Sequence, residues 1–139
     1  MSTLGVQIES KDIIINEKSI KFTFFMLGMK DQFSLFYRAY CQGADSAIIM
    51  YDITNSETLE RVSEWIQLLR KNSGDIPIIL VGNKVDLKSR EITTEEAMKI
   101  KDKFSLSGFY EISVKTGVNV EEMFREVVQL TLSNRGIVP

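Results

Sequence analysis

The stretch IILVGNKVDL, residues Ile78 to Leu87, is an apolar run that stops at Gly82 and continues as Asn83-Lys84-Val85-Asp86. A short, continuous apolar run is typical of a strand that is buried on both faces of a parallel sheet. Residues that directly follow such a strand lie at its carboxyl end, where sheets of this kind bind their ligands. The segment 83–86 is therefore the first candidate binding loop.

Strand and helix patterns alternate along the rest of the chain. An antiparallel hairpin followed by three strand–helix units predicts an α/β layered fold with a mostly parallel sheet, and residues 1–139 read as a single domain. The expected elements are a hairpin with strands near 13–15 and 20–25, a helix over 31–42, a strand at 47–52 buried on both faces, a helix capped at 55 or 56 and ended near 74, a strand at 76–82, a helix after a capping box at Thr93, a strand at 108–114 and a last helix capped by Asn119.

The composition excludes several classes of protein. Nineteen acidic residues against 17 basic ones give no field that would attract nucleic acid or anionic lipid. The single cysteine, Cys41, excludes an internal disulfide and suits a reducing compartment. No signal peptide, long apolar run or C-terminal cysteine is present in residues 1–139, so the expectation is a cytoplasmic chain without a membrane anchor.

The residue types in the loop 83–86 suit a purine base. The Asp86 carboxylate can accept two hydrogen bonds from the ring N–H and exocyclic amine of guanine, a pair that adenine does not offer. The Asn83 amide can bond the base edge and brace neighbouring loops, and the aliphatic stem of Lys84 can cover the base face. A chain of this length contains Asn-Lys-x-Asp by chance about two times in a hundred, so the match alone is only suggestive.

A second match, Ser113-Val114-Lys115, stands at the end of the next predicted strand. With both loops in order, the chain resembles the small GTPases of the Ras superfamily, nearest the Rab branch, and the resemblance extends to YDITNSETLERVSEWIQLLR and YCQGADSAIIMYD. It implies a Ras-type, P-loop-NTPase-like layered sandwich and a guanine-nucleotide ligand. STLGVQI resembles the end of the family's first switch, which would make Thr3 a magnesium ligand.

The chain also departs from this family. The resemblance starts after the family's first strand, phosphate loop and first helix, and none of the eight glycines is followed by lysine, so the expectation is a domain truncated at its N-terminus. The family's Asp-x-x-Gly-Gln falls on FMLGM. Phe25 then takes the place of the aspartate that reaches magnesium through water, and Met29 that of the water-orienting glutamine. Gly28 remains, the residue whose N–H meets the terminal phosphate.

These departures imply weak or no binding of GTP or GDP, magnesium only if nucleotide binds, and no hydrolysis by this chain alone. Three functions remain open. The first is a degenerate GTPase domain that keeps its guanine loops. The second is part of a working GTPase, whose phosphate loop is supplied by another chain or was trimmed away. The third is an interaction module that binds proteins.

The sheet raises a further expectation. In the family the first strand lies between the second hairpin strand and the strand equivalent to Ala47–Asp52, and without it two ladders of backbone groups lack partners. Either Ile20–Phe25 pairs directly and in parallel with Ala47–Asp52, giving five strands, or a strand of another molecule fills the gap. We expect self-association by one of these routes, or another protein partner.

Overall fold

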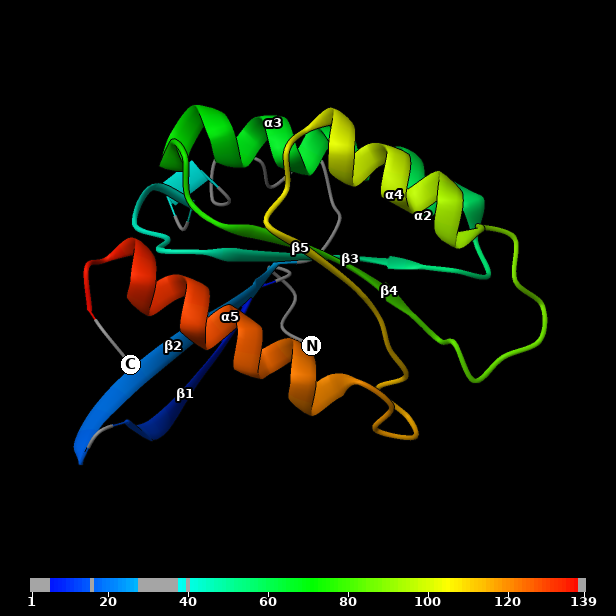
Figure 1. The fold of residues 1–139 in the computed structure, drawn as a ribbon. Helices are drawn as coiled ribbons and strands as arrows, with labels where there is room; N and C mark the ends of the chain where they lie inside the picture. The colour runs from blue at the N-terminus through cyan, green and yellow to red at the C-terminus, as the bar shows by residue number, and fades with distance from the viewer. Residues whose placement is uncertain (1–5, 16, 28–37, 40, 138–139) are drawn as a thin grey trace.

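A three-stranded parallel sheet forms the centre of the fold in the computed structural model (Figure 1), which describes residues 6–15, 17–27, 38–39 and 41–137. Its strands are β3 (Ala47–Asp52), β4 (Ile78–Asn83) and β5 (Gly108–Glu111), in the order β3-β4-β5. The predicted α/β class is confirmed. The apolar run that leads into the loop 83–86 forms β4, which is the central strand of the three.

Helices cover both faces of this sheet. On one face lie α2 (Ser56–Glu60), α3 (Val62–Ser73) and α4 (Thr94–Lys103), and on the other lies α5 (Val120–Asn134). Successive side chains of a strand point to opposite faces. Accordingly Leu80 belongs to the core cluster beneath α3, whereas Val81 belongs to the cluster against α5. The β4 side chains from Ile78 to Gly82 are all buried.

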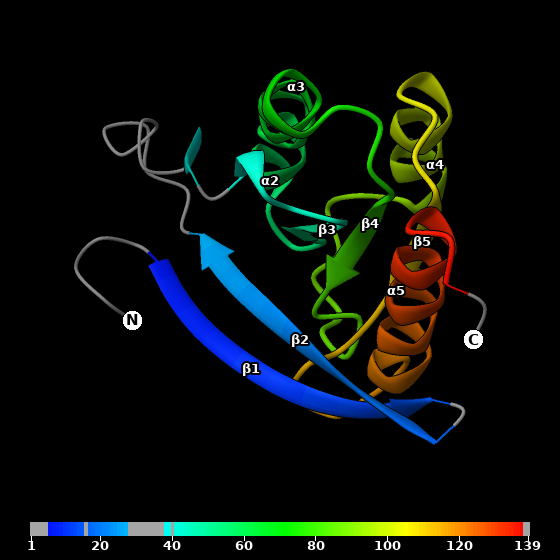
Figure 2. The ribbon, with the colours of Figure 1, turned by 90° about the vertical axis from the view of Figure 1, so that its left-hand side faces the viewer.

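The antiparallel hairpin forms a second sheet of its own, from β1 (Val6–Ile15) and β2 (Lys18–Leu27). Ile20 and Phe22 are half-buried while the intervening Lys21 is exposed, as the predicted alternation requires. Figure 2 shows the hairpin as a long arm that extends past the end of α5. The ammonium of Lys11 lies 5.9 Å from the centre of the Phe124 ring of α5, which ties the two parts together.

Direct pairing of the hairpin with β3 was a wrong expectation. β2 pairs only with β1, and β3 pairs only with β4 in the described part of the chain. The described residues therefore form sheets of two and three strands instead of the five-stranded sheet that direct pairing would give. The physical reason lies in the connections: an antiparallel pair forms locally through a tight turn, whereas parallel pairing with β3 depends on a long crossover connection.

One edge of β3 is consequently open. The Ala47 N–H donates to Pro77 O and the Ile53 N–H to Asn83 O, so the odd-numbered residues of β3 face β4. Parallel ladders alternate, which turns the backbone groups of Ile48 and Met50 toward the free edge. The Met50 side chain is 45% exposed. The expectation that this strand is buried on both faces is therefore wrong at Met50, where no described element covers the sheet.

Some helix ends also differ from the sequence pattern. The single helix expected over 55–74 is two helices, α2 and α3, separated at Arg61. Asn55 caps α2 through its side chain, and Thr93 forms the predicted capping box of α4 with Glu96. Asn119 precedes α5 but makes no side-chain cap, because its amide donates to Glu111 O instead. The helix expected over 31–42 lies mostly outside the described residues, of which 38–39 and 41–42 are helical.

Candidate functional site

The loop 83–86 begins where β4 reaches its carboxyl end. A turn follows, in which the Leu87 N–H donates to Lys84 O over 3.0 Å. Lys84 adopts a left-handed backbone conformation with φ of 75°, which is uncommon for a residue other than glycine. The turn leaves the side chains of Lys84 and Asp86 exposed while Val85 is half-buried. The two polar side chains are therefore presented to solvent by a rigid strand end.

The second loop follows β5 in the same way. Ile112 and Ser113 are buried, and Val114 and Lys115 are exposed. Gly117, with φ of 86°, closes the loop by donating its N–H to Ser113 O over 2.8 Å. The buried serine is thus fixed by its backbone at the base of an exposed loop.

Three hydrogen bonds join the two loops. Ser113 Oγ donates to Asp86 Oδ1 over 2.8 Å, and the Val114 N–H donates to Asn83 Oδ1 over 3.0 Å. The Val85 N–H donates to Ile112 O over 3.1 Å. Ser113 Oγ also accepts from the Thr116 N–H over 3.1 Å, which orients its proton toward the carboxylate. The sequence-predicted residues of the two loops therefore meet at one end of the sheet and hold each other in place.

A third strand end contributes a residue that the sequence analysis missed. Asp52 is the last residue of β3, and its Oδ2 forms an ion pair with Lys84 Nζ at 2.7 Å. Its other oxygen accepts from both the N–H and the hydroxyl of Thr54, over 2.9 and 2.6 Å. Partial burial opposes the charge, but the bonds from Lys84 and Thr54 outweigh it and hold the pKa of Asp52 below its ordinary value. The only sequence signal was its position at the end of a predicted strand.

A second ion pair braces the loop between β4 and α4. Arg90 donates to both carboxylate oxygens of Glu111, over 2.8 and 3.1 Å, and Thr94 donates to the same carboxylate over 2.9 Å. The hydrogen bonds from Arg90 lower the pKa of Glu111 despite partial burial. No spacing rule joins residues 90, 94 and 111, so sequence reasoning could not have found this cluster.

The chemistry of the loops fits a guanine base. Among the described residues, only Ser113 donates a hydrogen bond to the Asp86 carboxylate, so acceptor sites remain for two N–H groups. The Lys84 stem and the exposed Val114 offer apolar surface beside it, since 60% of the Val114 side chain is accessible. A planar base with two adjacent donors matches this arrangement.

The phosphate and magnesium side of the predicted site is different. Thr3, Gly28 and Met29 lie outside the described residues, and Phe25 is placed only by its backbone, opposite Ile8 in the hairpin. An aromatic ring and a thioether provide no oxygen ligand for magnesium. In the described part of the chain, no group of three or more His, Cys, Asp or Glu side chains could hold a metal ion. Phe25 and Met29 therefore offer magnesium no oxygen ligand at these two positions.

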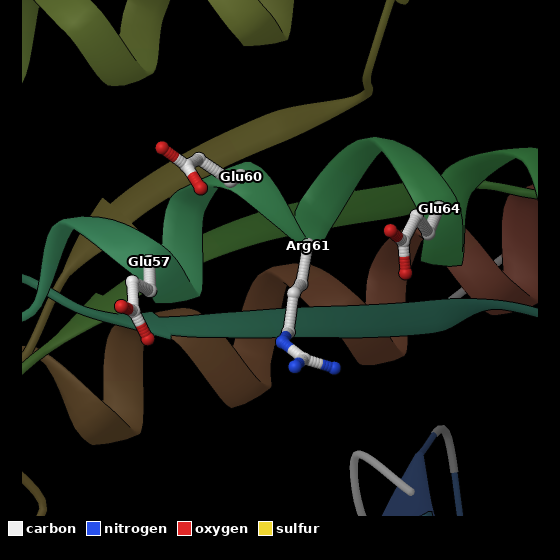
Figure 3. A pocket seen from close by; sticks show the side chains of 4 residues that line it. All are labelled: Glu57, Glu60, Arg61 and Glu64. Carbon is white, nitrogen blue, oxygen red and sulfur yellow. The ribbon is translucent and has the colours of Figure 1, made fainter. Parts of the chain in front are cut away.

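A surface hollow elsewhere has the wrong charge for phosphate. Figure 3 shows it at the junction of α2 and α3, where the Arg61 side chain extends between those of Glu57 and Glu64. Glu60 completes the lining. Three carboxylates against one guanidinium repel an anionic ligand. This hollow is therefore not the missing phosphate site.

Two polar loops at the carboxyl ends of adjacent parallel strands, in an α/β layered fold, are the arrangement of a Ras-type domain. The Ras family matches residues 1–133 of this chain. The chain belongs to the Ras family, as a Rab-like member of the Ras superfamily of small GTPases. The resemblance found in the sequence is confirmed.

Three relatives illustrate the similarity. Ras-related protein Rab-2B of Dictyostelium discoideum is 37% identical over 142 residues, covering 98% of this chain and 70% of that protein. GTP-binding protein ypt3 of Schizosaccharomyces pombe is 36% identical, covering 91% and 60%. Ras-related protein Rab5 of Nicotiana tabacum is 35% identical, covering 92% and 64%. The chain thus spans between 60% and 70% of the length of these three proteins.

Proposed function

We propose that this Rab-like domain keeps a guanine-base site but has lost phosphoryl-transfer chemistry, and that it acts through protein–protein interaction. The observation that carries the base site is the Ser113–Asp86 hydrogen bond, because it joins two loops at the point where a base would be read. Preformed loops lower the ordering cost of binding, since their side chains are already fixed.

The loss of phosphate chemistry rests on Phe25 and Met29. Both residues lie inside the chain, so they are the same whether or not a further segment precedes residue 1. Phosphoryl transfer depends on positioning and charge neutralisation, and neither side chain carries charge or a suitable oxygen. Base contacts alone would give about 4 kcal/mol, which corresponds to a dissociation constant of order millimolar. Such binding is too weak for a nucleotide switch.

Titration of residues 1–139 with guanosine, GDP and GTP, with and without magnesium, tests this function. We expect the three to bind alike, no tighter than about 100 µM, and without magnesium dependence, because the phosphates would add little. Two controls accompany the titration. Adenosine should not bind the unmodified chain, and guanosine should not bind the Asp86→Asn variant. Tight or magnesium-dependent binding of GTP would overturn the proposal.

A second function is favoured by the open edge of β3. The backbone groups of Ile48 and Met50, which have no partner strand among the described residues, could pair with a strand that also carries a phosphate loop. Such pairing would make this chain part of a working GTPase. Co-expression with candidate partners, followed by assay of GTP turnover, tests it. Turnover that needs both chains would favour this function over the first.

We further propose that the domain works in the cytoplasm. No helix in the described part of the chain is long and apolar enough to cross a membrane. The lone thiol of Cys41 is buried, which raises its pKa, and the described residues contain no disulfide. Fractionation of cells that express the tagged chain would test this location.

A further inference from the structure

The ion pair between Asp52 and Lys84 is held by an unusually well-fixed carboxylate. Asp52 Oδ2 lies 2.7 Å from Lys84 Nζ, while Oδ1 accepts two hydrogen bonds from Thr54. The backbone N–H of Asp52 donates to Thr58 Oγ1 over 2.9 Å, so the residue is also tied to α2. A carboxylate that is held on several sides draws the flexible lysine to one place.

Asp86, two residues further along the same loop, is an alternative partner for Lys84. Lys84 and Asp86 belong to the same turn, which the Leu87 N–H closes on Lys84 O. They are two residues apart and carry opposite charges, and the four-carbon stem of lysine is long and flexible. An ammonium on Asp86 would occupy the acceptor sites that a guanine N–H pair needs. The site therefore requires that Lys84 be kept elsewhere.

We propose that Asp52 is a positioning residue for the base site, which holds the Lys84 ammonium away from Asp86. Its carboxylate leaves Asp86 free to accept from the base and fixes the Lys84 stem beside the base plane. This role rests on the proposed function, because it concerns the same loops. Asp52 adds the end of β3 to a site that the sequence placed at the ends of two strands, β4 and β5.

Four variants isolate this role. Asp52→Asn keeps an Oδ1 that can accept from Thr54 but replaces the oxygen that binds Lys84 by an NH₂ group. Lys84→Met keeps an apolar stem and removes the charge, and the double variant combines the two. Asp45→Asn is the matched control, because Asp45 forms an exposed ion pair with Arg135 at 2.8 Å and is not part of the site.

Guanosine affinity is measured for each variant by NMR titration. Asp52→Asn should weaken guanosine binding about two- to fivefold, as expected for a partly exposed pair, and Asp45→Asn should leave it unchanged. The double variant should bind guanosine as well as Lys84→Met alone does. Once the Lys84 ammonium is removed, no ammonium remains for Asp52 to keep away from Asp86. A double variant as weak as Asp52→Asn would show that Asp52 merely supports the fold, and would overturn the role.

A ligand-free measurement separates this role from the proposed function. In Asp52→Asn the ¹³C resonance of the Asp86 carboxyl should shift at neutral pH, and it should return in the double variant. If guanosine fails to bind the unmodified chain but this shift is seen, the proposed function fails while the positioning role stands. An Asp86 resonance that is the same in all variants overturns the positioning role, whatever guanosine does.

Discussion

Ser113 Oγ lies 2.8 Å from Asp86 Oδ1, joining two residues that are 27 positions apart in the chain. The serine is fully buried, whereas the carboxylate it holds belongs to an exposed residue. Its hydroxyl accepts from the Thr116 N–H and so has its proton directed at Asp86. This single side chain couples the folding of one loop to the geometry of the other.

Ser113→Ala should therefore affect both stability and binding. The variant leaves the Thr116 N–H without its acceptor and the Asp86 carboxylate without its donor, which should cost about 1–2 kcal/mol of unfolding free energy. Guanosine binding should weaken as well. Chemical denaturation and NMR titration measure the two effects. Ser107→Ala, at an exposed serine, is the control, and a Ser113→Ala variant as stable as this control would contradict the prediction.

Restoring the two family residues of the second switch should not restore activity. The double variant Phe25→Asp, Met29→Gln should show no GTP turnover above background, because no Gly-Lys-Ser/Thr occurs in residues 1–139 to hold the phosphates. Phosphate release is measured at millimolar GTP with magnesium. A measurable rate that saturates with GTP would mean that a phosphate site exists among residues not assigned to one.

The Arg90–Glu111 pair should make stability depend on acid pH. The pKa of Glu111 is lowered in the folded chain, so its stabilisation is complete above the ordinary value of 4.5 and is lost as pH falls through the folded pKa. The difference in unfolding free energy between the unmodified chain and Glu111→Gln should be largest at neutral pH and shrink below about pH 4.5. Denaturation series at several pH values measure it. Glu60→Gln, at an exposed glutamate, should show no such trend.

Tyr51→Phe should leave stability unchanged or raise it. Tyr51 is only 2% exposed, and its hydroxyl has no hydrogen-bond partner in the described part of the chain. Removing a buried, unpaired hydroxyl should raise the free energy of unfolding by up to about 1 kcal/mol, because the cost of desolvating the hydroxyl disappears. Tyr110→Phe is the control, since Tyr110 is only half-buried and the loss of its hydroxyl should not stabilise the chain. Thermal unfolding that shows Tyr51→Phe clearly less stable would reveal a partner for the hydroxyl.

Self-association through the free edge of β3 remains a prediction. Met50 is exposed on β3, whose outer edge has no partner strand among the described residues, and it should lie in the contact because open edges template pairing with another strand. Met50→Lys should therefore shift the chain toward monomer, whereas Met98→Lys, at an exposed residue of α4, should not. Sedimentation over a dilution series measures both. A monomer at all concentrations in the unmodified chain would rule out the association.

The sequence by itself determined the elements and the loops. The buried strand Ile78–Asn83, the capping box at Thr93 and the alternation in the hairpin are local patterns, because strand burial and caps depend on neighbouring residues. Asn83 and Asp86 were found in the Asn-Lys-x-Asp match after a buried strand, and Ser113 was found in a second match at the end of the next predicted strand. Parallel strands bring their carboxyl ends together. In the structure Ser113 is hydrogen-bonded to Asp86, and the neighbouring Val114 is hydrogen-bonded to Asn83.

Only the tertiary structure decided what lies between elements. The sequence could not show that Asp52 pairs with Lys84, or Arg90 with Glu111, because ion pairs between separate strand ends follow no spacing rule. Of the two arrangements that it left open, the direct pairing of β2 with β3 is not formed: the hairpin stays a sheet of its own, and Met50 is exposed. A hairpin pairs locally through its turn, whereas parallel pairing between distant strands depends on how the whole fold places them.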